Sequence, residues 1–267
     1  MADLVRGTND ALFSKRDLGR IAFESPVLLG GAAARTGISC SSCHINGRRN
    51  PGFFIKGVSG DPGTADVTSS ILSKTRGNGV FDPKPIPDIS LRDGTQMKDR
   101  TGQAFRDKVH GLIAEEFDGG EPEPRVFEAV LAYLNALDPS ACTPGAVAEI
   151  GYGAPAGFAD IDDAQSAADA AIFLPDLPAS ERIFWLRVAR NRLERVYERE
   201  AEPVPQFFRD RLLKASEQLA AAAEAVRTGK EPQAVSQVDW MDLSSLAKEW
   251  EPKSLYNPQV LKAALAK

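Results

Sequence analysis

The stretch that decides the fold of the first half of the chain is Cys40-Ser41-Ser42-Cys43-His44. Two thiols are separated by two residues, and an imidazole follows the second thiol directly. In a C-x-x-C-H motif, each cysteine can form a thioether bond to a vinyl group of haem, and the histidine becomes the proximal ligand of the iron. The motif therefore predicts one covalently bound haem c, held by Cys40, Cys43 and His44.

Two other interpretations of the paired cysteines are open. A thioredoxin-like redox pair would sit between a strand and a helix, and the sequence around the motif lacks that pattern. Half of a zinc site would need two more ligands of similar softness. The remaining cysteine and histidine, Cys142 and His110, are the only ones that the chain offers. We therefore favour haem.

Composition places further limits on function. The 267 residues suffice for one large domain or two modest ones. The 32 basic and 37 acidic residues nearly balance, so nothing points to nucleic acid or an anionic membrane surface. No apolar run approaches the roughly 18 residues that a transmembrane segment needs. Haem attachment to this motif normally takes place outside the bacterial inner membrane. We therefore expect a periplasmic protein whose export signal has been removed ahead of Met1.

The pattern of residues predicts an all-α protein in two parts. Residues 1–142 are rich in glycine and proline with short helices, as expected of a mono-haem cytochrome domain wrapped around a planar cofactor. Residues 143–159 form a Gly/Pro/Ala-rich link, and residues 160–267 form a helical C-terminal extension. Alternation of apolar and polar residues never persists, so strands are not predicted.

Three helices are predicted in the first part. Ser14 can cap the first, which carries an apolar face and ends before Pro26. The last begins at Pro124 and continues to about Leu137 with an apolar stripe. We expect these two helices to cross with Gly19 at their closest approach, which is the usual frame of a class I cytochrome c. Between them, residues 101–117 form a helix whose inward side carries Phe105, Val109, Leu112 and Ile113, with His110 on its flank.

Several stretches resemble one family. Residues 17–26 (DLGRIAFESP) and Gly37-Ile38-Ser39 resemble the start of a haem domain of the bacterial di-haem cytochrome c peroxidases and their MauG-like relatives. Arg92-Asp93-Gly94 and residues 129–134 (AVLAYL) resemble later parts of that domain. The resemblance covers roughly residues 16–138 and implies a haem-bearing oxidoreductase. The family binds two haems, however, and this chain has a single attachment motif, so a two-haem peroxidase mechanism does not carry over.

The second axial ligand of the iron is open. In the related haem domain the distal ligand precedes a glycine on the helix after the Asp-Gly turn, and His110-Gly111 matches that placement. Met97 is the alternative, because class I cytochromes use a loop methionine at about this distance. An open position is the third choice. Arg76 and Arg92 are candidates to pair with the haem propionates, or are solvated surface charges. Phe53 is a candidate to pack on the porphyrin, or is ordinary aromatic core.

The second part reads as a helical hairpin or bundle without a catalytic set of residues. Helices are expected from Ser180 and again from Phe207 to Gly229, joined by a short connection that favours antiparallel packing. Arg192 and its neighbouring arginines alternate with glutamates, which favours a solvated, ion-paired surface over an anion site. These helices are expected to dock a redox partner protein or a second copy of the chain.

Two classes of function follow. The favoured one is a periplasmic c-type cytochrome that transfers single electrons through one haem, with His44 and His110 as its two axial ligands. The alternative is an enzyme, a single-haem peroxidase-like or MauG-like protein that handles an oxidant, with Glu115 or Glu116 as its acid/base group. A haem subunit whose activity resides in a partner chain is a third.

Overall fold

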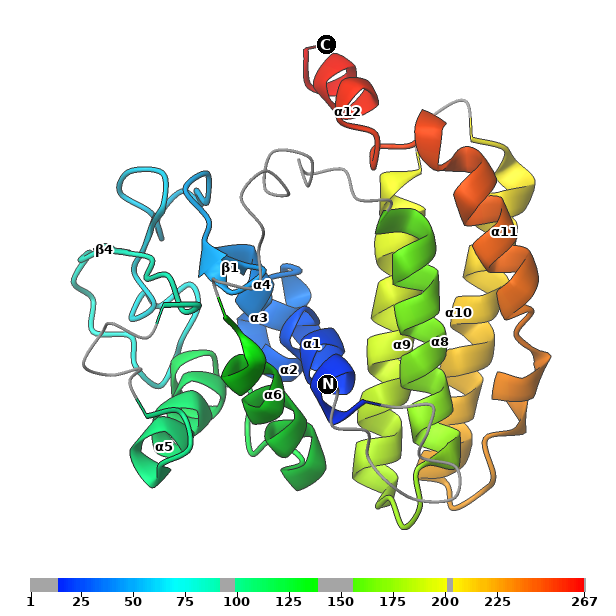
Figure 1. Cartoon of the computed structure of the whole chain (residues 1–267), viewed down its shortest axis with the longest axis horizontal. Helices are drawn as coiled ribbons and strands as arrows, with labels where there is room; N and C mark the ends of the chain where they lie inside the picture. Colours follow the sequence, from blue (N-terminus) through cyan, green and yellow to red (C-terminus); the bar gives the residue numbers. More distant parts are fainter. Residues whose placement is uncertain (1–13, 92–98, 139–155, 201–203, 267) are drawn as a thin grey trace. The chain divides into compact units, whose positions relative to one another are not determined.

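The computed structural model describes residues 14–91, 99–138, 156–200 and 204–266. Within these residues the chain is mainly helical, with four strands of two residues each. The chain divides into two compact units, Met1–Ala141 and Cys142–Lys267, here called unit 1 and unit 2 (Figure 1). The predicted all-α class is confirmed at this level.

The frame of unit 1 is a pair of helices from its two ends. Helix α1 (Lys15–Phe23) begins where the Ser14 side chain accepts a hydrogen bond from the Asp17 amide, so the predicted cap is confirmed. Helix α6 (Pro124–Ala136) begins with a proline in its first turn. The two helices pack together, and Gly19 of α1 lies against the backbone of Ala129 in α6. The predicted close approach at Gly19 is confirmed.

Short elements connect these two helices along the chain. Helix α5 (Gln103–Gly111) continues into the π-helical turn η2 (Leu112–Glu116), where a regular helix over residues 101–117 was expected. Strand β1 (His44–Ile45) pairs antiparallel with β2 (Arg48–Arg49), and β3 (Thr64–Ala65) pairs antiparallel with β4 (Lys84–Pro85). The remaining elements are the short helices α2 (Pro26–Leu29), α3 (Gly31–Arg35) and α4 (Cys40–Cys43).

Unit 2 is built on three long helices that lie side by side, α8 (Ala156–Phe173), α9 (Ala179–Arg199) and α10 (Gln206–Arg227) (Figure 1). Trp185 and Phe208 are fully buried among them. Helix α11 (Trp240–Trp250) packs on α8. The turns η4 (Gln233–Gln237) and η5 (Glu251–Lys253) and helix α12 (Pro258–Leu265) complete the unit. Residues 156–159, expected in the link, belong to α8.

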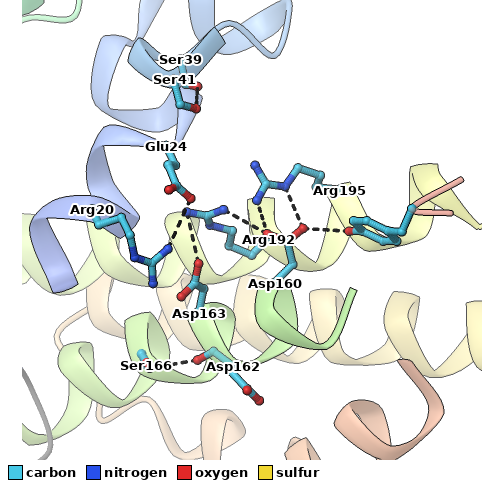
Figure 2. Close-up of polar contacts among 11 residues, drawn as sticks. Arg20, Glu24, Ser39, Ser41, Asp160, Asp162, Asp163, Ser166, Arg192 and Arg195 are labelled. Atoms are coloured by element: carbon cyan, nitrogen blue, oxygen red, sulfur yellow. Dashed lines mark hydrogen bonds and ion pairs between the residues drawn. The ribbon is translucent and has the colours of Figure 1, made fainter. Parts of the chain in front are cut away.

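A buried ionic network joins α8 to α9 in unit 2. Asp160 is 2% exposed and accepts hydrogen bonds from Arg192 Nη1 at 3.0 Å, from Arg195 Nε at 3.0 Å and from the Tyr256 hydroxyl at 2.8 Å (Figure 2). These partners hold the pKa of Asp160 below its ordinary value, although burial acts in the opposite direction. Arg192 is 1% exposed, so the expectation of a solvated arginine surface is wrong at this position.

Among the described residues, no helix combines the length and the apolar character needed to cross a membrane.

Candidate functional site

The two cysteines of the motif lie on a single helical turn. At the start of α4, the backbone amide of Ser39 donates to Ser42 Oγ at 3.0 Å. In return, the Ser39 side chain accepts from the backbone amide of Ser42. This reciprocal arrangement is a capping box, which fixes the start of the turn. Cys40 and Cys43, three residues apart, therefore lie on the same side of the turn.

A tight hairpin fixes His44, which directly follows the turn. Asn46 and Gly47 have positive φ angles of 51° and 76°, as a two-residue turn between antiparallel strands requires. The Asn50 side chain donates to the Ser42 carbonyl at 2.8 Å, and the Asn50 amide donates to the Cys43 carbonyl at 2.9 Å. These bonds hold the helical turn and the hairpin together. Asn-Gly after His44 is a signal that the sequence contained and that could have predicted this hairpin.

Cys40, Cys43 and His44 line one large cavity in unit 1. Its volume is about 850 Å³, within the range of cofactor sites. Apolar side chains from most elements of the unit form its walls, including Phe23, Leu29, Ile86, Phe105, Val109 and Leu134. The motif therefore lies against a space that is both large and apolar.

Burial keeps both thiols in the neutral form. It raises the pKa of Cys40 to about 12, with a further contribution from the nearby Cys43, and it raises the pKa of Cys43 to about 12. Reactive cysteines in redox motifs have the opposite property, a lowered pKa that favours the thiolate. The environment of this C-x-x-C therefore does not favour the dithiol exchange chemistry of a thioredoxin-like protein.

His44 is also held in its neutral form. Burial lowers the pKa of His44 to about 4, although the Pro87 carbonyl and the charge of Asp88 act in the opposite direction. Its Nδ1 atom is buried and has no partner with hydrogen-bond geometry in the described part of the chain. Neutral imidazole is the form that binds a metal. His44 therefore suits the role of an axial ligand.

Helix α5 and the turn η2 form one wall of the cavity. This wall carries the side of the helix that the sequence predicted to face inward. Phe105, Val109, Leu112 and Ile113 all line the cavity, as their helical spacing indicated. Glu116, at the end of η2, lines it as well. Turns of π-helix are rare and frequently lie at functional sites.

A second wall depends on Arg100, which the sequence analysis did not single out. Its guanidinium is buried and donates to the carbonyls of Leu134 and Leu137 at the end of α6, at 2.6 and 3.4 Å. It also donates to the carbonyls of Ile89 and Leu91, both of which line the cavity. Arg100 thus ties this segment of the cavity wall to the final helix of unit 1.

The structure does not place His110 in the cavity. His110 Nε2 lies 2.8 Å from Glu121 Oε2, and its ring meets the Phe127 ring edge-on. Lys108, Val109 and Leu112 of the same helical segment line the cavity, whereas His110 is not among the lining residues and is directed toward Glu121. Its predicted role as the second axial ligand therefore has no support from its position. The alternative, Met97, lies outside the described residues.

The other sequence-predicted residues are not brought together at the cavity. Arg76 is paired with Glu115, with its Nε 3.1 Å from Glu115 Oε2, and is not among the lining residues. Phe53 is buried and is not among the residues that line the cavity. Arg92 and Cys142 lie outside the described residues.

The described residues do not assemble a donor set for zinc. Across the described ranges, no three His, Cys, Asp or Glu side chains are grouped in a way that could hold a metal ion. The zinc interpretation needed Cys142 and His110, and His110 is directed toward Glu121. The residues around the motif therefore fit a large apolar cofactor better than a four-ligand metal ion.

Comparison with known proteins gives no significant match, whether with a protein-family model, a curated protein or a solved structure.

Proposed function

We propose that the protein is a periplasmic c-type cytochrome that transfers single electrons through one haem c in unit 1. The observation that carries this proposal is that Cys40, Cys43 and His44 all line a single apolar cavity of about 850 Å³. Covalent haem attachment needs two thiols and an imidazole directed into one cofactor-sized space. The packing of α1 on α6 at Gly19 further supports a class I cytochrome c-like domain.

The three residues of the motif would have two different roles. Cys40 and Cys43 would hold the cofactor covalently, and the neutral imidazole of His44 would ligate the iron. The apolar walls would keep water out and so tune the potential of the site. Haem bound there would supply a metal centre that changes its charge by one electron. Periplasmic location follows from the compartment in which such attachment normally takes place.

An oxidant-handling enzyme is the second candidate. The observation that favours it is Glu116, a carboxyl group that lines the cavity and could act as an acid/base group. An enzyme of this kind would also need an open or displaceable coordination position on the iron. A haem that keeps two firmly bound protein ligands would leave electron transfer as the remaining role.

Unit 2 is proposed to serve recognition. Among its described residues, the interior contains apolar packing and the Asp160 network, which joins α8 and α9. We assign it the docking of a redox partner protein or of a second copy of the chain.

The test of this function uses the haem-loaded full chain, produced in the bacterial periplasm with a haem-attachment system. We expect a reversible one-electron couple in a redox titration and no appreciable turnover of hydrogen peroxide with a one-electron donor. Rapid peroxide turnover that depends on Glu116 would replace electron transfer by the enzyme alternative. Absence of any haem-based couple would overturn both.

A further inference from the structure

Glu116 is the carboxyl group of η2 that lines the proposed haem cavity. Its Oε2 atom is buried and has no hydrogen-bond partner among the residues that the structure describes. A buried polar atom without a partner is uncommon in native proteins and calls for an explanation. The apolar walls around it include Leu112 and Ile113 of the same turn.

Two basic groups and one acidic group act on the charge of Glu116. Arg76 and Lys108 favour its ionised form, whereas Glu115 disfavours it. Arg76 is already paired with Glu115. Lys108 lines the same cavity as Glu116, and so do two further charged side chains, Lys84 and Asp88.

Burial is the largest influence on this carboxyl group. It raises the pKa of Glu116 above the ordinary 4.5, against the opposing effect of Arg76 and Lys108. The proton on Glu116 is therefore more tightly held than on a solvated glutamate. A further change of charge inside the same cavity would act on it strongly, because Coulomb interactions are stronger where water is excluded.

We propose that Glu116 takes up one proton from solvent when the haem iron in this cavity is reduced and releases it when the iron is oxidised. The proposal rests on the proposed function, which supplies the electron from a one-electron donor protein. As the iron goes from ferric to ferrous, the Glu116 carboxylate forms an O–H bond and becomes a neutral acid. One negative charge and one proton therefore enter the unit together, and the net charge of the cavity is conserved.

The direction of the coupling gives a measurable consequence. Reduction adds negative charge, which favours protonation of Glu116, so the reduced form binds the proton more tightly than the oxidised form. The midpoint potential should then fall as pH rises between the two pKa values of Glu116. For a one-electron couple, a tenfold change in proton concentration shifts the potential by at most about 59 mV.

The experiment measures the midpoint potential of the haem-loaded full chain from about pH 5 to about pH 8, in the unchanged protein and in Glu116→Gln. We expect the potential of the unchanged protein to fall with pH and the variant to lose that slope. Glu121→Gln, which changes an exposed carboxyl outside the cavity lining, should keep it. If Glu116→Gln keeps the full dependence of the midpoint potential on pH, that dependence arises from another group, such as a haem propionate, and the proposal is overturned.

A second measurement tests the proposal if the Glu116→Gln variant does not retain haem. Infrared difference spectra between the reduced and oxidised unchanged protein should contain a protonated-carboxyl band that appears on reduction and shifts in Glu116→Asp. A missing band, or one that does not shift, contradicts the role of Glu116. Absence of a haem-based couple would contradict the proposed function itself, whereas a couple with a potential that does not depend on pH would contradict only this inference.

Discussion

Gly19 of α1 faces the carbonyl group of Ala129 in α6 so closely that a β-carbon on Gly19 would lie 1.9 Å from that oxygen. The neighbouring atom belongs to the backbone, so it cannot move aside as a flexible side chain could. The contact between the first and last helices of unit 1 therefore depends on the absence of a side chain at this position.

Gly19→Ala should separate the two helices. We expect it to lower the free energy of unfolding by about 3 kcal/mol, because overpacking against rigid backbone forces the helices apart. Urea unfolding followed by circular dichroism measures the loss.

Gly111→Ala is the matched control for this change. Gly111 has helical angles, φ −60° and ψ −35°, and nothing lies within 4 Å of an added β-carbon. Alanine there should stabilise the protein by less than about 1 kcal/mol. Equal effects of the two substitutions would mean that the helices do not meet at Gly19.

Arg100 should be essential to the wall formed by Ile89 and Leu91. Arg100→Ala leaves buried carbonyl groups without donors and should cost about 3 kcal/mol in the free energy of unfolding. Arg100→Lys should restore little of this, since an ammonium group cannot reproduce the planar fork of a guanidinium group. Both variants should also load less haem.

The control for Arg100 is Arg35→Ala, which removes an exposed arginine at the end of α3. It should leave both unfolding and haem content nearly unchanged. If Arg100→Ala behaves in the same way, Arg100 does not hold the cavity wall.

The second axial ligand can be assigned from two substitutions. Because His110 faces Glu121 and Phe127, His110→Ala should leave the absorption and paramagnetic-resonance spectra of the ferric haem protein unchanged. If Met97 is the ligand, Met97→Ala should alter them and remove the near-infrared band typical of methionine ligation, whereas an open position leaves both variants unchanged. A spectral change in His110→Ala alone would restore the histidine interpretation.

Glu200 should make the stability of unit 2 depend on pH. Burial raises the pKa of Glu200 from 4.5 to about 7, with a contribution from Glu251 and against that of Arg209. The folded state therefore binds more protons than the unfolded state between these values, and stability should fall as pH rises from about 4.5 to about 7. The total loss corresponds to about 3 kcal/mol.

Glu200→Gln should abolish this fall, since the amide does not ionise, and Glu198→Gln should preserve it because Glu198 is exposed. Urea unfolding at several pH values distinguishes the two. A fall that persists unchanged in Glu200→Gln assigns the pH dependence to another group.

Local signals in the sequence predicted helices α1, α5 and α6 well. The Ser14 cap, the apolar stripes of α1 and α6, and the inward side of α5 depend on near neighbours in the chain, and each is present in the structure. The close approach at Gly19 was also predictable, because a glycine within an apolar helical face permits backbone contact.

Long-range partners could not be predicted in the same way. Arg192 is buried where it pairs with Asp160, which lies on another helix and 32 residues away in the sequence. Arg76 pairs with Glu115, which is 39 residues away in the sequence. The contact of His110 with Glu121 could not be predicted either, because a lone polar residue at the edge of an apolar stripe can face either way. Arg100 carried no local pattern at all, since its partners are backbone carbonyls.

The central claim is covalent haem on Cys40 and Cys43, and the mass of the intact chain tests it most directly. After periplasmic production and extraction with acidified acetone, the chain should retain its colour and carry the added mass of one haem. The double variant Cys40→Ala, Cys43→Ala should carry none. An unchanged mass in the native chain, with all colour lost to the solvent, would contradict the account.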